Sequence, residues 1–438
     1  MMNMMNNHDS MQIIKSVNKI KSTCGVESEI ASGLDLDLEG DTIDILYKMF
    51  LDIQETFNTI NVIETKNITR NVDPLIEIEE REKITRDIQN RYVEPKIQQL
   101  IINSLKTDKH GKGRRIRYTL KMDHSKLEYV VYFTTFNREL DLDYLDMCAV
   151  NIFTLVHFLS KSRSHDCEIQ TLELHIFLTP FKKLLPKKKG ATIGPENVNS
   201  GMTLPCQKTT RIIIFRQEEF MKLVVHETVH ALGIDIPHKF YQYYSEQLDR
   251  IFGIDSTYNL NETYTEFWAV TINILFQIIQ SIEPGGDRRA DDPTHIKGLI
   301  QDCYSLETTF SRIQTIKVLD WMGLSLGDIV NHAEKRGDFS EDTHVFAYYI
   351  LKYLLMENIT DVLSVVAGHI NFSDGLSDDA IRGRIDRLIG IIDHSLKRDG
   401  FIQRFFLDER SIRNISRSCT VYRGIILDTM RMTAIELA

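Results

Sequence analysis

The chain has 438 residues, of which 42% are hydrophobic and 26% are charged, and its formal net charge is -10. This composition is typical of a globular protein with a sizeable core. The negative charge argues against a nucleic-acid-binding protein. Two basic runs, "HGKGRRIR" at 110–117 and "KKLLPKKKG" at 182–190, are better explained as solvated loops than as targeting or phosphate-binding signals.

The six cysteines are scattered and include no CxxC pair. This argues against a disulfide framework and against a cysteine-bound metal, and it suits a reducing compartment. The N-terminus lacks the charged and apolar segments of a secretory signal. The apolar stretch at 267–279 is too short to span a bilayer. We therefore expect an intracellular, cytoplasmic protein that binds neither nucleic acid nor a membrane.

Residues 1–40 are polar and predict a flexible leader. Apolar residues then recur at spacings of three and four on both sides of Asp73 and Pro74, which predicts an N-terminal helical region at 41–110. The break at the proline is consistent with a helical hairpin. The region is either a separate domain or a helical lid on the domain that follows.

The apolar pattern then alternates between period two and helical spacing. Strands are predicted at 115–122, 127–136, 169–181 and 209–216, with helices at 144–161 and 217–233. The remaining chain is largely helical. The fold class is therefore α+β, with a core at 111–285 that combines a small mixed sheet with a central helix, and a mainly helical C-terminal subdomain at 286–438.

The stretch "VVHETVHALG" at 224–233 carries the strongest chemical signal. His226 and His230 are four residues apart and can direct both imidazoles at one point from a helix, while Glu227 can reach the same edge without binding. Zinc binds imidazole nitrogen readily, and three protein ligands leave a fourth position for water. The alternative is two histidines satisfied by hydrogen bonds. We favour zinc, because ionisable groups on a core helix need compensation.

The third ligand is not the histidine of the metzincin spacing HExxHxxGxxH, because Ile236 stands in its place and His238 comes two residues late. The stretch "NLNETYTEFWA" at 259–269 fits better: Asn259 or Asn261 can cap a helix on which Glu262 and Glu266 share one face. One carboxylate can bind the metal, and the other can accept the second ring N–H of a ligand histidine. The alternative is two solvated surface acids.

HETVH followed by NETYTE resembles the gluzincin group of zinc metallopeptidases, to which thermolysin belongs. The resemblance covers 197–279, under a fifth of the chain, and it implies a zincin-like catalytic core that binds one Zn²⁺ per chain. It also implies that His226, His230 and Glu262 bind the zinc, with Glu227 as general base. The same stretch is similar to uncharacterised proteins encoded by large DNA viruses.

The resemblance assigns Glu266 and Asn261 to the groups that hold the ligands in place. Glu266 stands where the thermolysin pattern has Asp, so the longer side chain has to be accommodated. The separation of His230 from Glu262 is also longer than in thermolysin.

The resemblance also implies an edge strand that binds the substrate ahead of the active-site helix. Asn199, Ser200 and Gly201 stand in the right order and could pair with a peptide as an added strand. An ordinary loop is the alternative.

The gluzincin group usually stabilises the oxyanion with a Tyr or His. His344 and Tyr348, at i and i+4 on a predicted amphipathic helix, are the candidate catalytic residues, with Tyr258 and Tyr264 as competitors. For each of them the alternative is a packing or surface role.

The sequence thus predicts a zinc metallopeptidase that hydrolyses a peptide or protein substrate. One alternative is a catalytically inactive protein of zincin fold with a structural or interaction role. Another is a zinc hydrolase that acts on a non-peptide amide. The oligomeric state is left open.

Overall fold

The computed structural model describes residues 38, 40–74, 82, 85, 95–107, 113–122, 127–136, 141–282, 292–331, 333–373, 375–405 and 428–435. The chain divides into two compact units. The helical unit comprises Met1–Leu51, Leu184–Val198 and Ile236–Ala438, and the sheet unit comprises Asp52–Lys183 and Asn199–Asp235. The predicted flexible leader lies outside the described residues.

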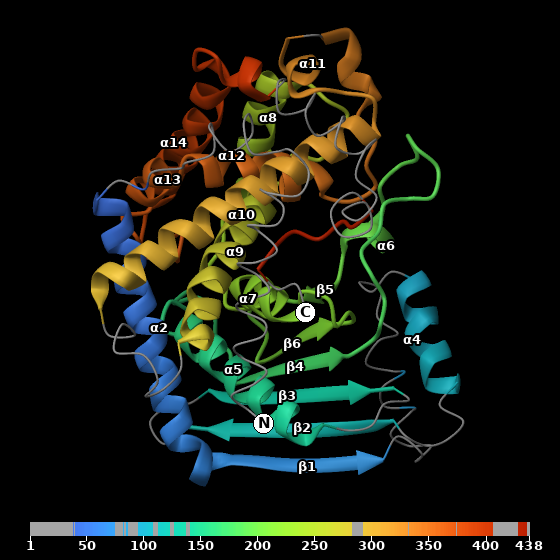
Figure 1. Cartoon of the computed structure of the whole chain (residues 1–438), viewed down its shortest axis with the longest axis vertical. Coiled ribbons are helices and arrows are strands. Elements are labelled where there is room, and N and C mark those ends of the chain that lie inside the picture. The colour runs from blue at the N-terminus through green and yellow to red at the C-terminus, as the bar shows by residue number, and fades with distance from the viewer. Residues whose placement is uncertain are drawn as a thin grey trace. The chain divides into compact units, whose positions relative to one another are not determined.

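The sheet unit is built on one mixed six-stranded sheet with the order β1-β2-β3-β4-β6-β5 (Figure 1). Neighbouring strands are antiparallel except for β3–β4 and β4–β6, which are parallel. The strands are β1 (Ile68–Pro74), β2 (Arg114–Lys121), β3 (Glu128–Thr135), β4 (Thr171–Phe177), β5 (Gly201–Thr203) and β6 (Thr209–Ile214). The short strand β5 therefore forms one edge of the sheet.

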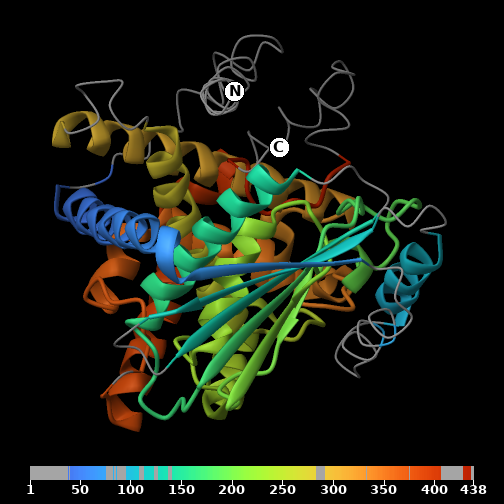
Figure 2. The same cartoon turned by 90° about the horizontal axis from the view of Figure 1, so that it is seen from below.

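Helices α5 (Leu142–Ser160) and α7 (Phe220–Ala231) pack against each other, with α5 also against β3 and α7 against β5 and β6. Helix α4 (Pro95–Thr107) lies beside the carboxyl ends of β3, β4 and β6, as Figures 1 and 2 both show. Its Ile97 and Ile101 form an apolar cluster with residues at those ends: Phe136, Phe177, Ile213 and Phe215. Helix α7 belongs to the core of the sheet unit, because 11 of its 12 residues are buried.

Helix α5 is long and apolar enough to cross a membrane by length and composition, but 67% of its most apolar window is buried inside the protein. Burial of this kind is typical of a core helix. Its interior position explains why its sequence is apolar on nearly every side.

The sequence predicts the strands β2, β3, β4 and β6 and the helices α5 and α7 close to their observed bounds. The helical prediction for 41–110 is correct for α2 (Gly40–Asn67) and α4 but wrong for β1, which pairs with β2. The reason is that Asp73 and Pro74 end a strand instead of breaking a helix. The fold is mixed α and β, as expected.

The scattered cysteines argued against a disulfide framework. This prediction is wrong for one pair of cysteines, because Cys167 and Cys206 form a disulfide within the sheet unit. Among the described residues, Cys148 and Cys303 do not take part in a disulfide.

The helical unit contains α6 (Pro195–Val198), η2 (His238–Phe240), α8 (Tyr241–Phe252), α9 (Leu260–Ser281), α10 (Pro293–Trp321), α11 (Leu326–Asn331), η4 (Ala333–Asp338), η5 (Phe346–Leu351), α12 (Lys352–Glu357), α13 (Ile359–Val365) and α14 (Asp378–Lys397), together with the first part of α2. Helix α9 packs against α8, α10, α12 and η5. Seventeen of its residues are buried, so its polar N-terminal turn is fixed by a large apolar contact.

Candidate metal centre

Helix α7 places the two histidines of the HExxH motif on a rigid, buried support. His226 and Glu227 are each 5% exposed, and the ring centroids of His226 and His230 are 4.9 Å apart. The helix ends as the sequence predicts, because Gly233 adopts a left-handed φ of 62°. The two imidazoles therefore lie next to each other on one face.

Helix α7 begins later than the predicted helix at 217–233. Helix α7 begins at Phe220, and Glu219 precedes it with a φ of 60°. The buried Lys183 Nζ lies 2.8 Å from a carboxylate oxygen of Glu219, and both side chains are at most 1% exposed. This ion pair holds the first turn in place, since breaking a buried pair leaves an uncompensated charge.

Asp235 is a partner of His230 that the sequence reading missed. Its Oδ2 lies 2.5 Å from Nδ1 of His230. A carboxylate only accepts hydrogen bonds, so this contact assigns the ring proton to Nδ1 and leaves Nε2 of His230 with a lone pair for a metal. Asp235 follows the turn at Gly233, and no periodic pattern marks it.

Helix α9 begins where the sequence predicts. The Asn259 side chain accepts a hydrogen bond from the backbone N–H of Glu262, so Asn259, and not Asn261, is the cap. Glu262 lies in the first turn. Glu266 follows one turn later and is fully buried. A buried carboxylate requires strong compensation, as the predicted role beside a ligand histidine would provide. The roles assigned to Glu266 and Asn261 stay predictions.

Among the residues that the structure describes, His226, His230 and Glu262 form a group that could hold a metal ion. Each side chain offers one ligand atom, and these atoms all lie within 4.8 Å of one another. Two imidazole nitrogens and one carboxylate oxygen are a typical donor set for catalytic zinc. These are the three residues that the motif resemblance implies.

Tyr348 lies at the Glu262 carboxylate. Its hydroxyl donates a hydrogen bond of 3.1 Å to Oε2 of Glu262, and its ring contacts His344 edge to face, with centroids 6.2 Å apart. The prediction that His344 and Tyr348 share an amphipathic helix is correct for Tyr348 and wrong for His344. His344 precedes the helical turns, and Tyr348 belongs to the π-helix η5, a distortion that is frequent at functional sites.

The C-terminal residues 428–435 hold η5 on its other side. The Tyr349 hydroxyl donates to the carbonyl of Met430 at 2.5 Å, and Lys352 Nζ donates to the carbonyl of Met432 at 3.1 Å. Since both anchors lie within four residues after Tyr348, they restrict how the Tyr348 backbone can move away from Glu262.

Glu341 links the segment before α9 to the start of η5. Its carboxylate accepts hydrogen bonds from the Ser256 hydroxyl and from the backbone N–H of Phe346, the latter at 2.8 Å. Burial raises the pKa of Glu341 to about 7, although the hydrogen bonds from Ser256 and Phe346 act in the opposite direction. Glu341 therefore changes charge near neutral pH.

Gly201 lies against the predicted general base. A Cβ atom added at Gly201 would lie 2.8 Å from Oε1 of Glu227, which is closer than real Cβ contacts. The other two predicted substrate-binding residues already use their carbonyls: Ser200 accepts from Phe215 N, and Asn199 accepts from Arg216 Nε. The edge position of β5 agrees with the prediction, and the substrate-binding role stays a prediction.

The competing tyrosines use their hydroxyls on the backbone. Tyr258 accepts from Ile254 N at 2.7 Å, and Tyr264 donates to Ile370 O at 2.7 Å. Both side chains are buried, so a packing role explains them.

Comparison with known proteins finds one weak similarity. The chain is 30% identical over 138 residues to a protein of Acanthamoeba polyphaga mimivirus described as "Uncharacterized protein R210". The matched part covers 30% of this chain and 29% of the viral protein. No protein-family pattern and no solved structure match. The similarity assigns no function.

Proposed function

We propose that the chain is a zinc-dependent metallopeptidase in which His226, His230 and Glu262 bind one zinc ion. The observation that supports this most directly is the grouping of their ligand atoms within 4.8 Å of one another. The donor set fits zinc, and Asp235 orients one imidazole in the way that carboxylates orient metal-binding histidines. An HExxH motif on a buried helix adds the base that hydrolysis requires.

A zinc ion held by His226, His230 and Glu262 would lower the pKa of a bound water and would polarise the scissile carbonyl. Glu227 takes the proton of the attacking water as general base and delivers it to the leaving amine. Gly201 gives the Glu227 carboxylate room to turn, because any larger side chain would meet it. Tyr348 is the preferred group to stabilise the oxyanion, because its hydroxyl is at the Glu262 carboxylate. His344 is the alternative.

The decisive experiment combines metal analysis with a Glu227→Gln substitution. The purified wild-type protein should contain zinc at close to one ion per chain and cleave members of a peptide library. The variant should keep its zinc and lose cleavage by a factor of roughly 100 or more, since it keeps the shape of the side chain without the base. Full activity in this variant would rule out the mechanism.

Two other outcomes separate the alternatives. Absence of zinc from the wild-type protein would favour the non-catalytic structural or interaction role. Zinc with no cleavage of any peptide would favour hydrolysis of a non-peptide amide. A His226→Ala variant is the matched control, since it should lose both zinc and cleavage.

A further inference from the structure

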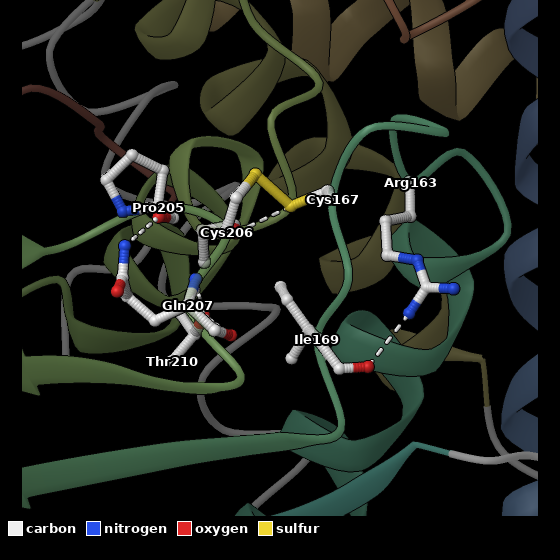
Figure 3. Close-up of a disulfide and its surroundings, with 8 residues drawn as sticks. Arg163, Cys167, Ile169, Pro205, Cys206, Gln207 and Thr210 are labelled. Atoms are coloured by element: carbon white, nitrogen blue, oxygen red, sulfur yellow. Dashed lines mark hydrogen bonds between the residues drawn. A yellow bond between two sulfur atoms is a disulfide. The ribbon is translucent and has the colours of Figure 1, made fainter.

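The disulfide of the sheet unit lies at the end of the histidine-bearing helix. Cys167 belongs to the loop between α5 and β4, and Cys206 belongs to the loop between β5 and β6 (Figure 3). The two loops are neighbours because β4 and β6 are parallel, with Thr171 opposite Thr209. The bridge therefore joins the two loops that precede these strands.

Both loops bind the last turn of α7 through the backbone. The N–H of Cys206 donates to the carbonyl of Ala231, and the N–H of Ser164 donates to the carbonyl of Leu232, each at 3.1 Å. The final carbonyls of a helix lack partners within it, so these two bonds complete the helix end. The disulfide also lies against Gly233, the glycine that follows the end of α7, because a Cβ at Gly233 would lie 3.0 Å from Sγ of Cys206.

These contacts surround the His230–Asp235 pair. Ala231 and Leu232 directly follow His230, and Asp235 lies two residues beyond Gly233. The path of the chain from His230 to Asp235 is thus set by the turn that the two loops hold. If the loops separate, the carbonyls of Ala231 and Leu232 lose fixed donors and the turn gains freedom.

We propose that the Cys167–Cys206 disulfide positions His230 and makes metal binding by this protein sensitive to redox state. The inference rests on the proposed zinc site. A dithiol reductant supplies two electrons, the S–S bond breaks, each cysteine sulfur takes one proton, and the dithiol closes to its own disulfide. The reduced loops are then held only by their hydrogen bonds, so the His230–Asp235 geometry is no longer enforced.

The two cysteines differ in exposure. Cys167 is 1% exposed, whereas Cys206 is half-buried and lies between the exposed residues Pro205 and Gln207. Cys206 is therefore the cysteine of the pair at which we expect a reductant to attack. Cys206 also has a left-handed φ of 56°, which a side-chain-bearing residue adopts at a cost. Opening the bridge allows this residue to relax and move its backbone N–H away from Ala231.

The test measures zinc affinity of the full-length protein in both redox states. Dithiols bind zinc, so a phosphine should be used: it is oxidised to the phosphine oxide while the two sulfurs take protons from water. After its removal without air, thiol counting confirms reduction. We expect zinc to bind roughly tenfold or more weakly to the reduced protein, within the range seen when groups that orient ligand histidines are lost. A Cys167→Ser/Cys206→Ser variant should bind equally weakly, without new thiols that could bind metal.

The control is Cys303→Ser, which removes a free cysteine and should keep the full redox response. Equal zinc affinity of the oxidised and the fully reduced wild-type protein would overturn the proposal. If the oxidised protein binds no zinc, the proposed function fails, and hydrogen exchange at 226–235 decides the positioning claim separately. Faster exchange after reduction supports the claim, and unchanged exchange refutes it.

Discussion

The pKa of Glu341 makes a quantitative prediction about stability. Burial raises this pKa from an ordinary 4.5 to about 7. The folded state then prefers the neutral carboxyl, so its contribution to stability is full below pH 4.5 and is lost as the pH rises through 7. At roughly 1.4 kcal/mol per pKa unit, the whole shift corresponds to about 3 kcal/mol, of which ~2 to 3 kcal/mol falls between pH 5 and pH 8.

Urea denaturation at pH 5, 6, 7 and 8 should reveal this loss. A Glu341→Gln variant keeps one carbonyl oxygen to accept the Phe346 N–H, while its amide NH₂ can face the Ser256 hydroxyl. The amide cannot ionise, so the free energy of unfolding of this variant should lack this part of the pH dependence. The difference between wild type and variant should change by about 2 to 3 kcal/mol across the range. Glu246→Gln, at an exposed position of α8, serves as the control and should follow the wild type. Parallel curves for wild type and Glu341→Gln would refute the reasoning.

Two further predictions concern the histidine helix. Asp235→Asn should weaken zinc binding by roughly 10- to 100-fold, because the amide orients the His230 ring less well than the carboxylate does. A zinc titration measures this affinity, and an unchanged affinity would contradict the hydrogen bond to Nδ1. Gly201→Ala should lower kcat by roughly tenfold or more without loss of zinc, because the new methyl group displaces the Glu227 carboxylate. The control for Gly201→Ala is Gly298→Ala, because a Cβ added at Gly298 meets nothing within 4 Å. Equal kcat values in the two variants would count against the close approach of Gly201 to the Glu227 carboxylate.

Local sequence patterns were sufficient to predict the histidine helix and the start of the glutamate helix. The spacing of His226 and His230 sets their common face, and Asn259 marks the start of α9 through a cap that needs only its neighbours. The strands β2, β3, β4 and β6 follow from their alternating or apolar runs. All these features depend on contacts within a few residues.

The features that were missed depend on contacts between distant residues. Cys167 and Cys206 are 39 residues apart, and they meet because β4 and β6 are parallel neighbours. Asp235 reaches His230 only after the left-handed turn at Gly233. Strand β1 was read as helix because its pairing with β2 has no local signal beyond a few β-branched residues. Sheet order would have been needed to predict the disulfide.

The backbone itself singles out α7 as a constrained element. Among the described residues, three that are not glycine have a positive φ: Cys206, Glu219 and Ala367. Two of these contact the ends of α7, since Glu219 precedes its first residue and Cys206 binds the carbonyl of Ala231. Each such conformation costs about 1 to 2 kcal/mol and persists only where surrounding contacts enforce it. The buried Lys183–Glu219 pair and the disulfide are those contacts, so both ends of the helix that carries His226 and His230 hold a strained residue in place.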